Sequence, residues 1–130
     1  MSLSLQRPDL FRQACLLAQG WHPVGSGPAI DVFNPATGER LGQVPALQAG
    51  ETEAAIAAAQ RALPAWAALT GKQRAGILRR WFDLMLAHQD DLARLMTLEQ
   101  GKPLAEARGE IAYAASFIEW FAEEGKRVDG

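Results

Sequence analysis

The residues best suited to chemistry in this sequence include a Gly-Lys pair, and its surroundings argue against a phosphate site. A phosphate-binding loop that ended at Gly101-Lys102 would need a glycine five residues before Gly101 and a serine or threonine after the lysine. Met96 and Pro103 stand at those two positions. We therefore interpret the pair as the end of a helix followed by a surface lysine.

Metal and thiol chemistry are disfavoured by the spacing of the histidines and the cysteine. His22 and His88 lie far apart and have no cysteine or acidic pair at ligand spacing nearby. Cys15 lies in an apolar segment without a neighbouring histidine or basic residue, and buried thiols in such surroundings are usually inert. Because it is the only cysteine, an internal disulfide is excluded and a reducing, cytoplasmic location is expected.

Among the acidic residues, Glu99 is the candidate for binding. Asp90-Asp91 and Glu123-Glu124 are adjacent in the sequence, so on a helix their side chains point about 100° apart and cannot share a substrate. Glu99 lies beside an expected helix C-terminus, where a negative charge is disfavoured unless a cation or donor offsets it. We expect a bound monovalent cation or a salt bridge there.

Composition excludes two classes of partner. The 130 residues, with 48% hydrophobic and 22% charged, fit one globular domain, and the four tryptophans are expected to be buried. The formal charge of −2 is not segregated into blocks, so we expect no nucleic acid and no anionic membrane as partners. No apolar run approaches the roughly 20 residues that span a bilayer.

The first region, about residues 1–48, is rich in glycine and proline and predicts short strands and turns. Strands are expected at 14–17 and 29–33, whereas the intervening GWHPVGSGP is expected to be a loop. The clearest hairpin is AIDVFNPATGERLGQVP, in which Asn34-Pro35 opens the turn and Gly38 tolerates a positive φ.

The second region, residues 49–130, is predicted to be helical. A first helix follows Gly50 and is interrupted by Pro64. Thr70 begins a second helix through a capping box with Gln73. One apolar stripe is predicted on that helix, formed by Ile77, Leu78, Trp81, Leu84 and Met85, and a break is expected near His88.

The last helix is predicted from Pro103 to about Lys126, after a stop at Gly101. One face is predicted from its apolar residues Leu104, Ala107, Ile111, Ala114, Ala115, Ile118 and Phe121, and Ala112, Phe117 and Trp120 extend the apolar surface around the helix. A helix that is apolar around so much of its circumference is expected to pack against neighbours on more than one side, and the rest of the chain contains few segments that could be those neighbours. By themselves, the residues predict a largely helical unit that contains no assembled catalytic site and no dinucleotide fingerprint.

Three segments together resemble the N-terminal quarter of NAD(P)-dependent aldehyde dehydrogenases, and within that family most closely the bacterial succinate-semialdehyde dehydrogenases. They are FNPATGERLGQVP, ALPAWAALTGKQRAGILRRW and HQDDLARLMTLEQGKPLAEARGEIAYAASFIEWFAEEGKRV. The resemblance implies an α/β, aldehyde dehydrogenase-like fold, of which residues 1–130 are the N-terminal portion of the cofactor-binding domain. That portion is a β-hairpin followed by mostly α-helices, without the Rossmann-like sheet core, the catalytic domain or the oligomerisation domain.

The same resemblance implies that a full-length parent oxidises succinate semialdehyde to succinate with NADP or NAD, through a cysteine nucleophile. The parent is expected to be a homodimer or homotetramer, and this chain is expected to pack against the remainder of the same polypeptide. The chain contains neither the G-Q-x-C nucleophile segment nor the E-L-G-G general-base segment. It is expected to be an inactive fragment without catalytic or cofactor-binding residues and without bound cofactor.

Two groups of site residues follow from the resemblance. Glu110, Ala114 and Phe117 match a helix whose inner face borders the aldehyde entrance tunnel in related enzymes. Glu99 matches an acidic residue that helps to hold a monovalent cation, together with backbone carbonyls at the positions of Val32 and Phe33.

Two alternatives stay open from the sequence. The parent could act on another class of aldehyde, because none of these residues is expected to contact the succinate carboxylate. The chain could also be a freestanding helical interaction module that docks through its apolar last helix. A reading frame that continued into G-Q-x-C and E-L-G-G would favour the enzyme over the module.

Overall fold

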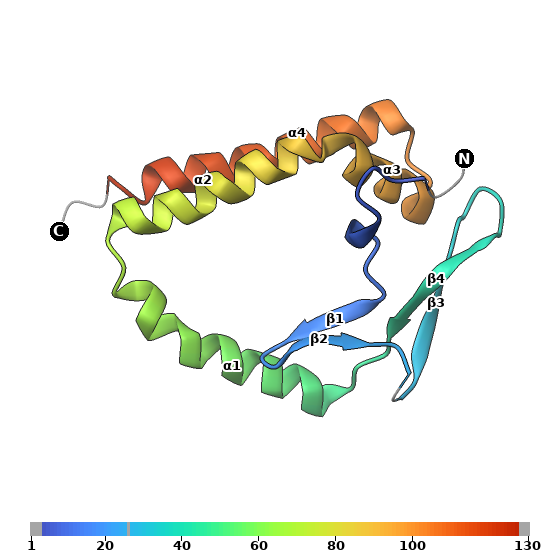
Figure 1. The fold of residues 1–130 in the computed structure, drawn as a ribbon, viewed down its shortest axis with the longest axis horizontal. Helices are drawn as coiled ribbons and strands as arrows, with labels where there is room; N and C mark the ends of the chain where they lie inside the picture. Colours follow the sequence, from blue (N-terminus) through green and yellow to red (C-terminus); the bar gives the residue numbers. More distant parts are fainter. Residues whose placement is uncertain (1–3, 26, 128–130) are drawn as a thin grey trace.

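A computed structural model describes residues 4–25 and 27–127, which form two β-hairpins and four α-helices (Figure 1). After a short 3-10 helix, η1 (Pro8–Leu10), the strands are β1 (Ala14–Leu17), β2 (Gly20–Pro23), β3 (Ala29–Phe33) and β4 (Arg40–Pro45). The helices are α1 (Ala49–Ala67), α2 (Gly71–Ala87), α3 (Gln89–Gln100) and α4 (Leu104–Glu124). The described strands form two separate two-stranded sheets.

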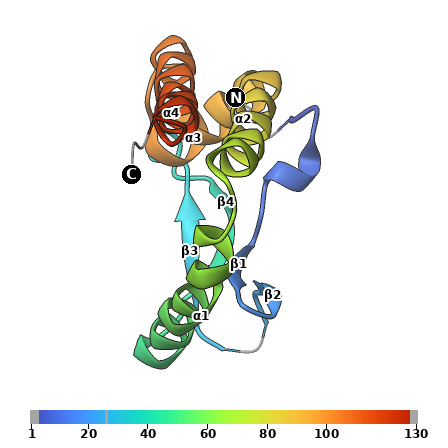
Figure 2. The same ribbon diagram turned by 90° about the vertical axis from the view of Figure 1, so that its left-hand side faces the viewer.

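The helices form a layer from which α1 is separated. α2 and α4 lie side by side along their length, and α3 packs against the N-terminal part of α4 (Figures 1 and 2). α1 lies on the opposite side of the molecule and contacts β1, and no residue of α1 is buried. No helix in the described part of the chain is both long and apolar enough to cross a membrane.

The β1–β2 hairpin corrects the expectation that residues 20–28 are a loop. β2 pairs antiparallel with β1, and Leu17 lies opposite Gly20 across a two-residue turn. Gly20 has a φ of 111°, a conformation that glycine adopts without strain. Glycine and proline bound this strand at both ends, so only two residues between them carry the strand pattern, and the sequence signal is that of a turn.

The β3–β4 hairpin confirms the predicted turn. Asn34 is buried, and its Oδ1 accepts a hydrogen bond from the Ala36 N–H at 2.9 Å. Gly38 has a φ of 71°, and its N–H donates to the Asn34 carbonyl at 2.8 Å. The side chain of Asn34 and the flexibility of Gly38 therefore fix the turn locally.

The helix boundaries confirm the predicted capping box, break and stop. Thr70 and Gln73 cap α2, and the Gln73 N–H donates to Thr70 Oγ1 at 3.3 Å. His88 separates α2 from α3, and Gly101 ends α3 with a φ of 81°. The last helix begins one residue later than predicted, because Pro103 has a ψ of 138° and lies before the first helical residue.

The prediction that Pro64 interrupts the first helix is wrong, because α1 continues through Pro64 to Ala67. Proline removes its own N–H from the helical hydrogen bonds, and its ring crowds the carbonyl four residues before it, but the carbonyl of the proline itself remains available. The Pro64 carbonyl still accepts from the Ala68 N–H at 3.0 Å. The helix thus loses one internal bond near its end and retains the last turn.

The predicted apolar faces of the long helices are only partly correct. On α2, Leu78 and Met85 are half-buried, whereas Ile77, Trp81 and Leu84 form a second, exposed stripe. On α4, Ala122 is buried in place of Phe121, which is 61% exposed, and Ala114 is exposed as well. α2 and α4 are each other's main neighbours and α4 also packs against α3, which leaves the remaining surface of both long helices exposed.

The core of the helical layer is small and consists mostly of alanine. One cluster joins Ala93 of α3 to Ala107 and Ile111 of α4, with Leu92, Met96 and Leu104 packed around it. The expectation of buried tryptophans is wrong, since Trp21, Trp66, Trp81 and Trp120 are all exposed. Much of the large apolar surface therefore lies outside this core.

Candidate functional site

The three predicted tunnel residues lie on one side of α4, away from its buried face. Glu110, Ala114 and Phe117 follow one another at helical spacing, and all three are exposed. Glu110 forms an ion pair with the Lys102 ammonium, and Phe117 packs edge-on against Tyr113 with ring centroids 4.8 Å apart. The structure thus brings the three side chains to one surface, and their tunnel role stays a prediction.

A groove of about 680 Å³ follows the C-terminal half of α4. Its lining includes four aromatic residues, Tyr113, Phe117, Trp120 and Phe121, and a charged rim that contains Glu119, Glu123, Glu124 and Arg127. We call the four aromatic residues the α4 aromatic face. Glu110 and Ala114 lie outside this groove, so only Phe117 joins the predicted tunnel residues to it.

The charged rim of the groove contains short, solvent-exposed ion pairs. Arg79 of α2 pairs with Glu119, which raises the pKa of Arg79 through the hydrogen bond between them. The Lys126 ammonium lies 2.6 Å from Glu123 Oε2, and this hydrogen bond lowers the pKa of Glu123. Glu123 therefore stays ionised at neutral pH.

The predicted cation-binding residues come from two elements that touch. α3, which carries Glu99, contacts β3, which carries Val32 and Phe33. The end of α3 also meets the turn after β3, because a Cβ placed on Gly101 would lie 3.0 Å from Pro35 Cγ. The fold therefore brings the C-terminal end of α3, where Glu99 lies, close to the turn that follows Val32 and Phe33, and cation binding itself stays a prediction.

Thr97 is a polar residue that sequence analysis did not select. Its Oγ1 is buried and has no hydrogen-bond partner among the described residues. Thr97 and Glu99 are two positions apart, with only Leu98 between them, so their side chains point to nearly opposite sides of α3. Thr97 therefore does not extend the predicted cation site.

Cys15 has a histidine neighbour that sequence reasoning missed. In the β1–β2 hairpin Cys15 lies directly opposite His22, and both are half-buried. Directly paired residues place their side chains on the same face of a hairpin. The Cys15 Sγ donates a weak hydrogen bond to the Pro45 carbonyl at 3.9 Å.

The described residues form no metal cluster, and the Gly-Lys pair is not arranged as a phosphate loop. Within residues 4–25 and 27–127, no group of three or more histidine, cysteine, aspartate or glutamate side chains could hold a metal ion. Lys102, the cation of the Gly-Lys pair, is paired with Glu110, and Gly101 ends a helix instead of beginning one. The Gly-Lys pair therefore does not fit a cofactor phosphate.

Comparison with known proteins identifies similar sequences and structures. Residues 21–130 match the family model described as the aldehyde dehydrogenase family. Over 128 residues the chain is 67% identical to a succinate-semialdehyde dehydrogenase [NADP(+)] of Escherichia coli (strain K12), covering 98% of this chain and 27% of that protein. A glutarate-semialdehyde dehydrogenase of Pseudomonas aeruginosa is 62% identical over 98% of this chain and 26% of its own length.

A crystal structure of succinate-semialdehyde dehydrogenase from Burkholderia pseudomallei superposes with a TM-score of 0.92 at 59% identity. The superposition covers 98% of this chain and 26% of that one. The chain thus spans about a quarter of the length of the proteins it matches. Its two hairpins and four helices are consistent with an N-terminal part of their fold.

Proposed function

The chain belongs to the aldehyde dehydrogenase family, and on that premise we propose that it forms the N-terminal portion of the cofactor-binding domain of a semialdehyde dehydrogenase. The proposed reaction of the parent enzyme is oxidation of succinate semialdehyde to succinate with NADP or NAD. The observation that carries this proposal is the 67% identity over 98% of the chain to an enzyme named for that substrate and for NADP(+).

Glutarate semialdehyde is the second candidate substrate. Two Pseudomonas relatives named glutarate-semialdehyde dehydrogenase are 62% and 61% identical over the same 98% of the chain. The two aldehydes differ by one methylene group and both end in a carboxylate. A parent enzyme selective for such substrates needs a cation or donors for the carboxylate, and we propose that these come from the rest of the polypeptide.

In this proposal the chain supplies scaffold and one wall of the substrate entrance. Glu110, Ala114 and Phe117 would border the aldehyde entrance, and the carboxylate of Glu99 with the carbonyls of Val32 and Phe33 would hold a monovalent cation. The cation would offset the charge of Glu99 at the negative C-terminal end of α3. Nucleophile, general base and cofactor contacts would come from outside these residues.

The substrate prediction concerns the purified parent enzyme. We expect kcat/KM for succinate semialdehyde to exceed that for short aliphatic aldehydes by roughly 100-fold or more, because an aldehyde without the carboxylate leaves its binding groups unpaired. We expect about a tenfold margin over glutarate semialdehyde, the usual effect of one methylene group. Steady-state kinetics with each aldehyde, with NADP and NAD in parallel, measure both ratios.

Betaine aldehyde serves as the control, because it carries a cationic group in place of the carboxylate. Equal kcat/KM values for succinate semialdehyde and betaine aldehyde would refute the substrate assignment. A higher kcat/KM for glutarate semialdehyde than for succinate semialdehyde would make glutarate semialdehyde the proposed substrate.

A further prediction concerns a protein consisting of residues 1–130 alone. The α4 aromatic face and the exposed stripe of α2 form apolar surface that a monomer rarely leaves uncovered. We expect this protein to bind a hydrophobic dye and to self-associate, and the double substitution W120Q/F121Q to reduce both effects. A monodisperse monomer without dye binding would contradict the proposal that these surfaces pack against the rest of the polypeptide.

A further inference from the structure

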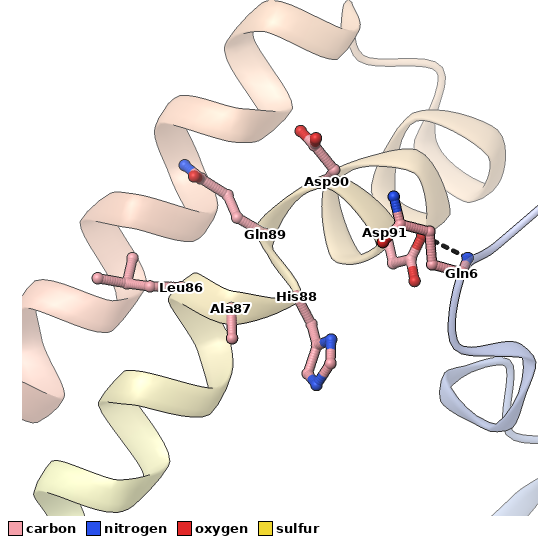
Figure 3. A pocket seen from close by; sticks show the side chains of 7 residues that line it. All are labelled: Gln6, Leu86, Ala87, His88, Gln89, Asp90 and Asp91. Atoms are coloured by element: carbon pink, nitrogen blue, oxygen red, sulfur yellow. Dashed lines mark hydrogen bonds between the residues drawn. The ribbon is translucent and has the colours of Figure 1, made fainter.

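A buried carboxylate of α3 holds the N-terminal segment. Asp91 is 4% exposed, and its Oδ1 accepts a hydrogen bond from the Gln6 N–H at 3.0 Å (Figure 3). Its Oδ2 accepts from the Arg7 N–H at 2.8 Å. Because both donors are backbone groups, the contact does not depend on which side chains follow at positions 6 and 7.

The same segment is fixed at a second point, on β4. Gln13 Oε1 accepts a hydrogen bond from the Gln43 N–H at 2.9 Å. The side chains of Phe11 and Gln13 cover Gly42 so closely that a Cβ there would lie 2.8 Å from Phe11 Cζ. Residues 4–12, which we call the N-terminal strap, therefore run between a hydrogen-bonded contact on α3 and a packed contact on β4.

Between these two points the strap is held weakly. η1 contains no buried residue, and the ion pair between Arg7 and Asp9 lies within the strap with both side chains about half exposed. Exposed ion pairs contribute little, and this one does not reach another element. The polar attachment of the upstream half of the strap therefore depends mainly on Asp91, and its apolar side chains Leu5 and Leu10 are only half-buried.

Two cavities flank the Asp91 contact. One of about 140 Å³ is bordered by His88 and Gln89, and one of about 200 Å³ is bordered by Ser4 and Arg94. Gln6, Asp90 and Asp91 line both cavities. The strap at Gln6 is thus part of the wall between them.

We propose that residues 4–10 of the N-terminal strap open and close as a unit at Asp91, while the side chains of Phe11 and Gln13 remain fixed on β4. Opening exposes the Asp91 carboxylate and joins the two cavities beside α3. Segments with little buried apolar surface and few attachments are the ones that open independently of the rest of a fold. The inference rests on the described contacts and is independent of the proposed enzymatic function.

The test measures the amide hydrogen-exchange rate of each residue in the intact protein and compares it with the rate in the Asp91→Asn variant. Asparagine keeps one acceptor oxygen but turns an NH₂ group toward the other backbone N–H. We expect the Gln6 and Arg7 amides to exchange about tenfold faster or more in the variant. The Leu10 and Phe11 amides, which donate to the Arg7 and Pro8 carbonyls, should accelerate too.

Two other variants separate opening of the strap from general destabilisation. Asp90 is the residue before Asp91, and its side chain is 62% exposed and paired with Arg108, so Asp90→Asn should leave the exchange of the Gln6 and Arg7 amides slow. Gln13→Ala should accelerate the Gln43 amide without affecting Gln6 and Arg7. The proposal would be overturned if Asp91→Asn accelerated exchange of the Gln43 and Ile111 amides as much as that of the Gln6 and Arg7 amides. It would also be overturned if the Gln6 and Arg7 amides were unprotected in the wild type.

Discussion

Replacement of Leu98 by alanine is expected to lower the free energy of unfolding by about 2–5 kcal/mol. Leu98 is 1% exposed and has the largest fully buried side chain among the described residues. Most of the other buried apolar residues are alanines, including Ala93, Ala107 and Ala115, which have no long side chain that could move into the cavity. Because the surrounding residues cannot fill the cavity left by the leucine side chain, we expect the loss of unfolding free energy to lie in the upper part of this range.

The matched control for Leu98→Ala is Leu86→Ala. Leu86 lies on α2 and is 40% exposed, so the same atoms are removed from a site that already meets solvent. We expect this variant to lose less than about 1 kcal/mol, because little apolar area returns to water and no closed cavity forms. Urea unfolding of both variants, followed by far-UV circular dichroism, gives the comparison. Equal losses would contradict the assignment of Leu98 to the core.

The features that sequence predicted correctly are those determined by neighbours in the chain. The Asn34 side chain and the Gly38 φ act within one turn, and the Thr70–Gln73 capping box acts within three residues. The stop at Gly101 also depends on one residue's freedom to adopt a positive φ. Such local chemistry can be predicted without knowledge of the tertiary structure.

The features that sequence missed depend on distant partners. The sequence identifies Asp91 only as one of two adjacent acids that cannot share a substrate, whereas in the structure its carboxylate oxygens accept hydrogen bonds from backbone N–H groups 84 and 85 residues away. The second stripe of α2 was merged with the first because apolar periodicity does not show how many sides of a helix are covered. Cys15 and His22 are neighbours only through β2, a strand that glycine and proline concealed.

The candidate site was predicted more by resemblance than by chemistry. Glu99 alone was selected by physical reasoning, from its place at a helix C-terminus. Glu110, Ala114 and Phe117 are ordinary residues of an amphipathic helix, and no spacing rule distinguishes them from a packing surface. The role proposed for them depends on groups that the described residues do not include.

Gly101→Ala is expected to lower the free energy of unfolding by about 1–3 kcal/mol, the usual cost of a strained backbone conformation. Two physical effects act in the same direction. At a φ of 81° an alanine Cβ crowds its own backbone, and that Cβ would also lie 3.0 Å from Pro35 Cγ. Relief of the second contact requires Pro35, and with it the turn after β3, to give way by a few tenths of an ångström.

Gly109→Ala provides a control of opposite sign. Gly109 lies inside α4, has no positive φ and would place its Cβ in open space. Alanine there is expected to raise the free energy of unfolding by about 0.5–1 kcal/mol, because it restricts the unfolded chain and favours the helix. Urea unfolding of the two variants should therefore move the midpoint in opposite directions, and a stable Gly101→Ala would show that the αL conformation is not required.

The same substitution links stability to the proposed cation site. Movement of the Asn34-Pro35 turn would carry Val32 and Phe33 away from Glu99, since β3 leads directly into that turn. If those three residues hold a monovalent cation, the parent enzyme should gain thermal stability from potassium or sodium, and Gly101→Ala should reduce that gain more than Gly109→Ala does. The destabilisation by Gly101→Ala without added salt is independent of the cation. If potassium or sodium raised the thermal stability of the parent enzyme, Gly101→Ala and Gly109→Ala equally, the cation site would be refuted and the backbone argument would stand.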